Sequence, residues 1–409
     1  MNAPSTAPNV LPADKPSAAK WAAGVSDAEA LDVAIERARA ALGSLADKPD
    51  VLMVFVSPHH EARYGELAER LAQSIEPAAL VGCSGNAVIG AGTELEGRPG
   101  LALLAGRIPG CTVRAHWLSP DVPPPEDERW LEIAGDDPRG FILLADPFTL
   151  DADAVGRALD QRRQGATVGG LASGALRRGE TAIFLDGRLE RTGGALLSLS
   201  GDVTLDAVVA QGCRPVGRPR FVTRARGNVI DQIDGRSAAS VLRELYEQLD
   251  ERDSKLFRNS LFIGIAMREQ AETYQIGDFL VRSLIGVDTR SGALAIGAPV
   301  EDYTVIQFHL RDAQTSTEEL EQLLARYVDE HTGQTQPESA LVFSCLGRGV
   351  GLYGEPDHDS RRITNALGRL PTAGFFCNGE IGPVRDKTFL HGYTSALAIL
   401  RPRDDKNPA

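Results

Sequence analysis

Several polar side chains suited to binding or catalysis follow one apolar run near the end of this 409-residue chain. Cys377, Asn378 and Glu380 come directly after Ala373–Phe376, on a turn that contains Gly379. Glycine lets the backbone approach a bound molecule closely, and the N–H groups of such a turn can point at it. Small polar ligands need a few well-placed polar groups in a mostly apolar pocket. We therefore expect Cys377, Asn378 and Glu380 to take part in a small-ligand site.

Arg348 follows the preceding apolar run, Ala340–Cys345, at a position that could meet Glu380 across adjacent strand ends. An arginine fork binds a carboxylate through two hydrogen bonds, while a glutamate accepts from an ammonium group. Together, Arg348 and Glu380 would suit an amino-acid-like ligand. Equally, the two side chains could form a structural ion pair between neighbouring loops. The sequence leaves both interpretations open.

Cysteine chemistry is a second hypothesis for the same segment. Cys377 and Cys83 occupy similar places in two copies of one pattern, and His391 is the nearest histidine after Cys377. A nucleophilic cysteine needs a histidine or a cation to hold it as thiolate, but a small buried cysteine is commoner, and Ser84 lacks the GxSxG context. We therefore expect Cys83, Ser84 and His391 to contribute to ligand binding rather than to catalysis, although a structural, hydrogen-bonded histidine is the commoner role for a residue such as His391. An enzyme that acts on a small metabolite through Cys377 or Glu380 is the alternative.

Histidine and acidic residues give no metal or haem signature. Asp357, His358 and Asp359 offer three side chains in one loop, but adjacent side chains of an extended loop point apart. Haem ligation by His358 or His391 would be chemically feasible, yet the chain contains no CxxCH motif. We therefore predict no cofactor.

The elements that position these residues form a repeated pattern. An apolar run, a segment with helical periodicity and a second apolar run end at a glycine-containing turn, about 30 residues apart, which is the length of a βαβ unit. The pattern predicts an α/β fold of two related halves, each a mixed β-sheet with flanking helices, built from repeated βαβ-like units. The paired runs are Val51–Val56 with Leu80–Asn86, Phe141–Ala145 with Thr167–Gly174, and Ala340–Cys345 with Thr372–Pro383.

The segment between the second and third copies has a different character. Helical periodicity marks Ser237–Gln248 and Ser316–Tyr327. Between these two helices, apolar runs of strand length occur at Leu261–Ala266, Phe279–Ile285, Ala293–Ile296 and Thr304–Leu310. We place a domain boundary near residue 205, at the start of this segment.

The predicted domain organisation is therefore a leader, two domains and a tail. The leader is rich in Ala, Pro and Ser, a composition typical of disorder. The expected limits are 1–25 for the leader, 26–205 and 206–402 for the domains, and 403–409 for the tail.

Composition excludes several classes of protein. A formal net charge of -13 argues against a nucleic-acid-binding face, and the apolar runs are too short for a membrane helix. The five cysteines are scattered and form no CxxC pair, which argues against a disulfide framework or a zinc knuckle. Reduced thiols are typical of the cytosol, so we expect a cytoplasmic protein without membrane insertion.

Taken together, these motifs resemble the FIST family, which has an N-terminal and a C-terminal domain. The N-terminal domain is matched by Val81–Gly85 and the later Glu94. The C-terminal domain is matched more closely, by Gly212–Gly217, Phe343–Arg348, Gly374–Pro383 and Leu390–Thr394. The resemblance covers roughly residues 30 to 400, and the order of the motifs carries it.

The resemblance implies a sensory module of intracellular signalling that binds a small ligand, for which amino acids or similar metabolites have been proposed. Its halves would be the FIST N-like domain at 26–205 and the FIST C-like domain at 206–402. Because the chain shows no F-box or output segment, we expect a stand-alone module whose signal passes through a partner protein. A protein-interaction scaffold without a ligand pocket is a further alternative.

Overall fold

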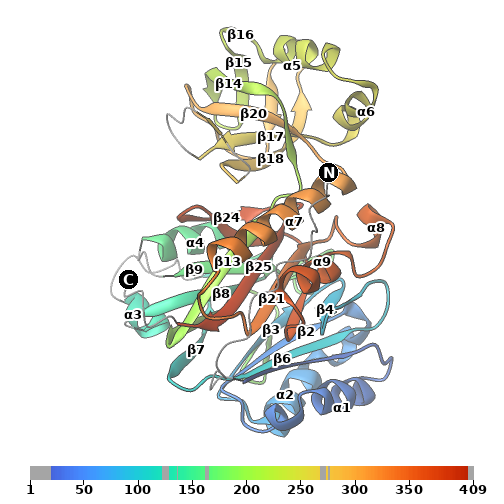
Figure 1. Ribbon diagram of the computed structural model, residues 1–409, viewed down its shortest axis with the longest axis vertical. Coiled ribbons are helices and arrows are strands. Elements are labelled where there is room, and N and C mark those ends of the chain that lie inside the picture. Colours follow the sequence, from blue (N-terminus) through green and yellow to red (C-terminus); the bar gives the residue numbers. More distant parts are fainter. Residues whose placement is uncertain are drawn as a thin grey trace, which may run out of the picture.

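The structure is a computed structural model that describes residues 20–121, 129–135, 137–161, 165–267, 273–274 and 277–403. It consists of a large core with a smaller lobe above it (Figure 1). The core contains three repeats of one unit within the described residues, and the lobe is inserted into the third. The α/β class and the βαβ-like units predicted from the sequence are confirmed.

Unit 1 shows the common plan. A helix joins two parallel strands. An antiparallel strand pairs on one side with the first of these two strands and on the other side with the strand that begins the unit, so that the order is β1-β6-β2-β3. Its elements are β1 Lys20–Ser26, α1 Leu31–Ala41, β2 Val51–Val56, α2 Tyr64–Ile75, β3 Ala79–Ser84 and β6 Leu101–Arg107.

Unit 2 repeats this plan in the order β7-β12-β8-β9. Its elements are β7 Cys111–Leu118, α3 Arg129–Ala134, β8 Pro138–Ala145, α4 Ala152–Asp160, β9 Ala166–Leu171 and β12 Gly194–Gly201.

Unit 3 has the order β13-β25-β21-β22, and the lobe interrupts it between β13 and α7. Its elements are β13 Val203–Ala210, α7 Ala313–Glu330, β21 Ser339–Cys345, α8 Val350–Tyr353, α9 His358–Leu367, β22 Thr372–Cys377 and β25 Ser395–Pro402.

Each unit also sends a hairpin into the sheet of another unit. The hairpin of unit 1 pairs with β22 of unit 3, that of unit 2 with β3 of unit 1, and that of unit 3 with β9 of unit 2. The hairpins therefore link the three units in a closed cycle. They are β4 Val88–Gly90 with β5 Thr93–Leu95, β10 Ile183–Leu185 with β11 Arg188–Glu190, and β23 Glu380–Val384 with β24 Lys387–His391.

One glycine in each unit fixes the register of the parallel pair. A Cβ atom added at Gly374 would lie 1.8 Å from the carbonyl oxygen of Val342, its partner on β21. The equivalent distances are 2.1 Å for Gly82 in unit 1 and 1.9 Å for Gly169 in unit 2. No side chain fits at such a distance, so glycine is required wherever the two backbones approach this closely.

The three sheets face one another around a common apolar core. Their inner faces meet in one cluster, in which the rings of Phe55 and Phe375 stack with centroids 5.3 Å apart. The outer faces are covered by helices, α1 and α2 on the first sheet, α4 on the second, and α7 with α9 on the third. This arrangement places the ends of β3, β9 and β22 together, because hydrogen bonds link the turns that follow them.

The inserted lobe is a β-barrel. Within its described residues the pairings run β14-β20-β17-β18-β19-β15 and then back from β15 to β14, which closes the sheet. Helix α5 packs on the apolar interior of this barrel. The lobe contains β14 Arg214–Arg226, β15 Val229–Ile233, β16 Arg236–Ser237, α5 Ala238–Glu247, α6 Glu251–Asn259, β17 Leu261–Ala266, β18 Phe279–Val287, β19 Leu294–Ile296 and β20 Val305–Leu310.

The predicted disordered leader is wrong where it can be compared with the structure. Residues 20–25 form most of β1, which pairs along its whole length with β6. The alternation of apolar residues in this segment is short, and the composition rich in Ala, Pro and Ser therefore favoured disorder over a strand in the sequence-based prediction. The rest of the leader and residues 404–409 of the tail lie outside the described residues. The predicted boundary at residue 205 falls within β13 and stays a prediction.

Candidate functional site

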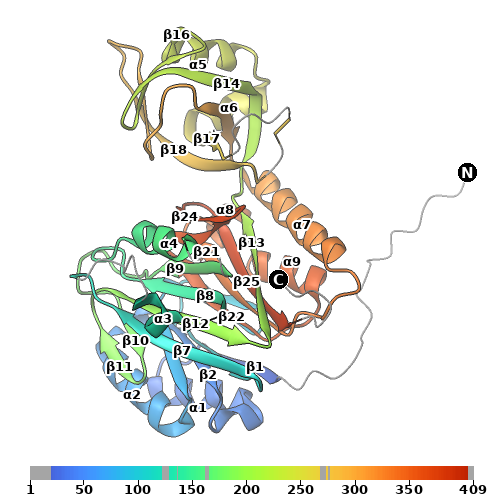
Figure 2. The same cartoon turned by 90° about the vertical axis from the view of Figure 1, so that its left-hand side faces the viewer.

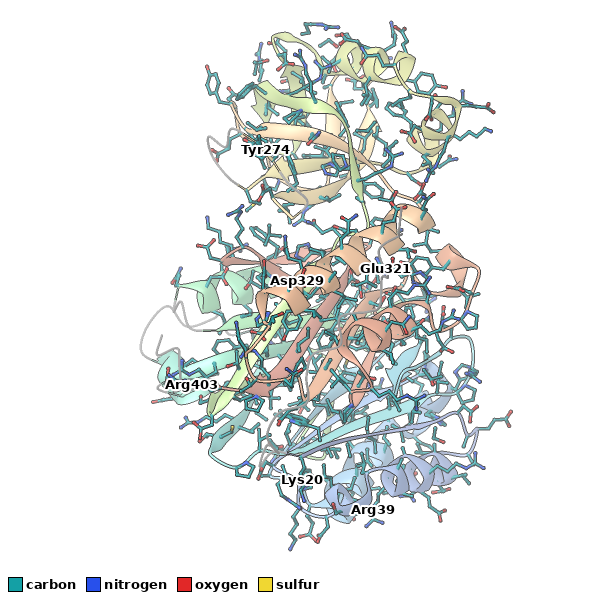
Figure 3. All side chains as sticks on the ribbon, in the orientation of Figure 1. Lys20, Arg39, Tyr274, Glu321, Asp329 and Arg403 are labelled. Atoms are coloured by element: carbon teal, nitrogen blue, oxygen red, sulfur yellow. The ribbon has the colours of Figure 1, made fainter. Side chains whose placement is uncertain are left out.

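A cavity of about 350 Å³ lies at the junction between the barrel and the core. Its walls include Phe279 and Val281 from β18, His309 from β20, and Glu319 from α7. Figure 3 shows Tyr274, another wall residue, on the barrel, and Glu321, close to Glu319 in sequence, on α7 of the core. The cavity therefore has walls from both parts of the molecule.

The barrel wall presents a buried histidine. His309 is 4% exposed, and its Nδ1 lies 3.0 Å from the carbonyl oxygen of Gln307, so the neutral ring donates from Nδ1 and keeps Nε2 as an acceptor. Burial lowers the pKa of His309 to about 4. Gly264 makes this position possible, because a Cβ there would lie 2.4 Å from the His309 ring. The barrel therefore contributes a neutral imidazole near neutral pH.

The core wall presents a buried carboxyl group. Glu319 accepts the backbone N–H of Gly212, a residue with a positive φ of 70°. Burial raises the pKa of Glu319 to about 7, although the Gly212 hydrogen bond and the charge of Arg348 oppose the shift. Glu319 can therefore exchange a proton near neutral pH. A charged group that binds beside Glu319 would therefore change its protonation state.

Gln211 joins the two walls. Its Nε2 donates to the carbonyl oxygen of Phe279 at 2.6 Å, and its Oε1 accepts the N–H of Val281 at 2.9 Å. The core side chain thus extends the backbone pairing of β18. An ion pair between Arg385 and Asp278 also crosses the junction. These contacts hold the barrel against the core.

Arg348, predicted to bind a ligand carboxylate or Glu380, pairs with Asp359 instead. Its Nε and Nη2 lie 2.8 and 3.1 Å from the two carboxylate oxygens of Asp359, and its Nη1 donates to Ser316 at 3.0 Å. Arg348 is 1% exposed. The predicted Arg348–Glu380 pair is therefore wrong, and the fork of Arg348 is already occupied. The sequence favoured Glu380 because the two strand ends are adjacent, but Asp359 at the start of α9 lies closer.

Glu380 is buried with unsatisfied hydrogen-bonding capacity. Its Oε2 accepts the N–H of Thr394 at 3.0 Å, and its Oε1 has no partner among the described residues. Burial raises the pKa of Glu380 to about 8. His391 lies opposite on β24, donates or accepts through Nε2 at 3.0 Å from the oxygen of Gly382, and has its pKa lowered to about 4 by burial. The two predicted site residues are thus neighbours, both largely uncharged at neutral pH.

Cys377 and Cys83 are packed in the apolar core. Both side chains are fully buried, and burial raises the pKa of each thiol. The described hydrogen bonds of Cys377 reach the carbonyl oxygen of Phe375 at 3.6 Å and not His391. A neutral buried thiol is a poor nucleophile, so the structure gives no support to cysteine catalysis.

The two cysteines also do not occupy equivalent places, as the sequence suggested. Cys83 pairs with Phe55 next to the register glycine Gly82, whereas Cys377 pairs with Cys345, three residues after Gly374. When the units are aligned on their register glycines, Cys83 and Cys377 therefore lie two residues apart. The glycine contact with the neighbouring carbonyl, rather than the cysteine, marks the equivalent position.

The remaining predicted residues lie where the three strand ends meet. Ser84 Oγ donates to the carbonyl oxygen of Ser173 at 3.1 Å and accepts the N–H of Ala182 at 3.0 Å, so its hydrogen bonds are satisfied. Asn378 is exposed, and its backbone N–H donates to Leu171 at 3.1 Å. A ligand role for Asn378 stays a prediction. We refer to these three strand ends, with Ser84, Ser173 and Cys377, as the hub.

Sequence reasoning missed the cavity residues His309, Glu319 and Gln211. A signal was present for the first of them. Thr304–Leu310 was predicted as a strand, and Gln307 and His309 alternate with Ile306 and Phe308 along it. Such alternation indicates one polar face on a strand that is otherwise apolar. Glu319 gave no comparable signal, because a glutamate on a helix is usually exposed.

No group of residues that could hold a metal ion occurs in the part of the chain that the structure describes. His358 stacks on Tyr353 with ring centroids 3.3 Å apart, and its Nδ1 lies 2.9 Å from Asp359. The prediction of no cofactor remains untested. None of the described helices is long and apolar enough to cross a membrane.

Comparison with known proteins identifies relatives along most of the chain. An uncharacterized protein of Mycobacterium tuberculosis is 35% identical over 92% of this chain and 99% of its own length. An uncharacterized protein of Mycobacterium bovis is 33% identical over 91% of this chain and 96% of its own. An F-box/LRR-repeat protein of Arabidopsis thaliana is 25% identical over 36% of this chain and 32% of its own.

A solved structure, a cyanuric acid hydrolase from A. caulinodans, matches with 9% identity and a TM-score of 0.36 over 94% of this chain and 100% of that one, too weakly to carry an argument. The FIST N domain model matches residues 50–236, and the FIST C domain model matches residues 238–383. The two-part organisation predicted from the sequence corresponds to these two domains. The chain therefore belongs to the FIST family, whose domains are described as sensory domains of signalling proteins.

Proposed function

We propose that this chain is a small-molecule sensor of intracellular signalling, and that its ligand binds in the cavity between the barrel and the core. An amino acid or a metabolite of similar size is the proposed ligand. The observation that carries the proposal is the cavity itself, at about 350 Å³, whose walls combine apolar side chains with the polar groups of Gln211, His309 and Glu319. Ligand sites in proteins have this size and composition.

The connection between the barrel and the core supports a sensory role. The chain passes between them through two short links, residues 211–213 and 311–312 (Figure 2). Domain motions occur at such links when the interface is small and polar. A ligand held by His309 from the barrel and Glu319 from the core would favour the arrangement in which the barrel lies against the core. A change in barrel position would then be the signal that a partner protein reads.

The sequence-predicted residues have a supporting place in this proposal. Against the larger effect of burial, the charge of Arg348 lowers the pKa of Glu319 in the cavity wall and also that of Glu380. Burial keeps Glu380 largely protonated. A proton gained or lost at Glu319 therefore changes the net charge of the group formed by Arg348, Glu319 and Glu380. We propose that Arg348 and Glu380 tune the cavity rather than contact the ligand.

Thermal unfolding of the purified chain against a metabolite library that contains the amino acids tests the proposal. A ligand that binds the folded state alone stabilises it by about 2.7 kcal/mol at a hundred times its dissociation constant. The cavity-filling variant Val281→Phe should lose the shift. Val287→Phe is the matched control, because Val287 lies on the same strand with 41% of its surface exposed.

Two results would count against the proposal. One is the absence of any stabilising compound for the wild-type chain. The other is a stabilising compound whose effect is the same in Val281→Phe, which would place its site elsewhere. In the first case the scaffold alternative would be preferred.

A further inference from the structure

Arg311 lies at the junction, immediately after the last strand of the barrel. Along β20 the side chains of Ile306 and Phe308 enter the barrel interior, whereas Gln307 and His309 line the cavity. Arg311 continues this outer, polar face two residues after His309. It is 8% exposed. A guanidinium group is therefore buried where the barrel meets the core.

Arg311 differs from the other buried arginines of the described chain. Each of the others forms an ion pair: Arg220 with Asp234 at 3.1 Å, Arg348 with Asp359 at 2.8 Å, and Arg401 with Asp206 at 2.6 Å. Arg311 has no carboxylate within ion-pair distance in the described residues. Its Nη2 donates to the carbonyl oxygen of Gly347 at 3.1 Å, and its Nε has no partner there.

No carboxylate of the described residues compensates the charge. Arg348 lies close enough to lower the pKa of Arg311, although burial is the larger cause. The Asp359 carboxylate is already shared by Arg348 and His358. Burial keeps the nearby Glu380 largely protonated at neutral pH. A buried cation without a counter-ion is strongly unfavourable, so its presence needs an explanation other than stability.

The guanidinium of Arg311 also lies beside a loop that solvent can reach. The guanidinium lies over the ring of Tyr393, 4.7 Å from its centroid, and Tyr393 is partly exposed. The neighbouring Gly392 is exposed and has open space where a Cβ would project. The loop beside Arg311 is therefore accessible from solvent.

We propose that Arg311 is an anion-binding residue, and that it receives a small carboxylate or a similar oxyanion at the junction between barrel and core. The anion supplies the missing counter-charge. It also accepts a hydrogen bond from Nε, which lacks a partner in the described residues. Arg311 thereby assumes the role that the sequence assigned to Arg348. The inference goes beyond the cavity, because the anion can be a free one or the acidic group of the cavity's ligand.

Acetate is the probe for this site. Thermal unfolding of the full chain is measured in a titration of sodium acetate against sodium chloride at equal ionic strength. The wild-type midpoint should rise saturably with acetate. Arg311→Met should abolish the rise, and Arg311→Lys, which keeps the charge without the fork, should weaken acetate binding at least tenfold.

The same variants test why the charge is there. Without acetate, Arg311→Met should unfold at the same temperature as the wild type or higher, because it removes an uncompensated buried charge. Arg220→Met, which breaks a paired buried arginine on the barrel, should unfold at a clearly lower temperature. If Arg311→Met proves as unstable as Arg220→Met, or if acetate stabilises wild type and Arg311→Met equally, the inference is wrong.

The cavity variant separates the two sources of the anion and the two proposals. Persistence of the acetate effect in Val281→Phe would identify a free-anion site, and its loss would make the anion part of the cavity's ligand; both outcomes support Arg311. If acetate has no effect while a library compound stabilises the chain through Val281, the anion site fails and the cavity stands. If acetate binds through Arg311 but no library compound stabilises the chain, the anion site stands and the cavity proposal fails.

Discussion

The hub and the junction are built on opposite principles. At the hub, where the repeated units meet, Ser84 and Ser173 exchange hydrogen bonds with the neighbouring strands, and Cys83 and Cys377 are packed among apolar side chains. At the junction between barrel and core, Arg311 and Glu380 are buried with polar atoms that lack partners in the described structure. The hub is therefore a closed structural centre, whereas the junction retains capacity for a ligand.

This difference shows where repetition is informative. The recurring motif of the sequence marks the hub, because close packing of equivalent strands demands similar residues in every unit. The junction exists once, since a single unit carries the barrel. Residues that serve a function there have no counterpart in the other units, and a search for repeated motifs passes over them.

The sharpest contrast is between a buried arginine and an exposed one. Arg348→Met should lower the free energy of unfolding by about 3–5 kcal/mol, because it leaves the Asp359 carboxylate buried without its cation. Urea unfolding measures the loss. The exposed Arg63, paired with Asp32 and Glu66, is the control, and Arg63→Met should change stability little because water screens exposed ion pairs. If Arg348→Met lowered the free energy of unfolding as little as Arg63→Met, the buried ion pair would contribute no more to stability than an exposed one.

The register glycines test how rigid the hub is. Gly374→Ala should destabilise the chain by about 1–3 kcal/mol or more, since the added methyl group meets a backbone carbonyl that cannot move aside. Gly169→Ala should behave alike, because its contact is equivalent. Gly286→Ala on β18, where no atom lies within 4 Å of the added group, is the control. Equal stability of Gly374→Ala and the control would mean that the parallel strands can shift.

The junction should respond to pH through Glu380. Its folded pKa of about 8 exceeds the ordinary value of 4.5, so the folded state holds a proton that the unfolded state has lost. Stability from this group is present at low pH and is lost as pH rises through this window. Relative to Glu380→Gln, the wild type should lose up to about 1.4 kcal/mol per pH unit between pH 5 and 8.

Chemical denaturation of wild type and Glu380→Gln at several pH values checks this expectation. Glutamine keeps an acceptor for the N–H of Thr394 and carries no charge. The two proteins should therefore be closest in stability near pH 5. Parallel pH profiles would show that Glu380 is hydrated and titrates normally.

Cys377 should give the smallest effect. Cys377→Ala removes one buried sulfur and should cost about 1 kcal/mol, without altering the binding of acetate or of any library compound. In the folded wild type, the Cys377 thiol should resist alkylation by iodoacetamide. Mass spectrometry of the chain after treatment measures the extent of labelling. Rapid labelling of Cys377 under native conditions would reopen the cysteine chemistry suggested by the sequence.

The fold was largely predictable from local patterns. The strands Leu261–Ala266 and Thr304–Leu310 were placed within one residue of β17 and β20, and the parallel pairs of the units followed from paired apolar runs. Closure of the barrel was missed, because the pairing of β14 with β15 completes a ring that no single segment reveals. The first strand was missed because a composition rich in alanine masked its short alternation.

The candidate site was less predictable, for a physical reason. Arg348 was predicted to bind a ligand carboxylate or Glu380, but its actual partner depended on which of several acidic residues the tertiary fold brings nearest. Arg311 was not considered, since the sequence cannot show that a charged residue lacks a partner. Cys377 was misjudged because glycine and cysteine are adjacent in unit 1 and separated in unit 3.

The cyclic exchange of hairpins has a consequence for synthesis of the chain. Ile89 on β4 pairs with Gly374 on β22, so the sheet of unit 3 takes its edge from a segment made near the beginning. The hairpin β4–β5 must therefore wait, without its partner strand, while the ribosome produces the second unit and the entire barrel. Folding should proceed slowly, as expected for contacts so distant in sequence. Fragments cut between the two family domains would expose the unpaired strands as edges that favour aggregation.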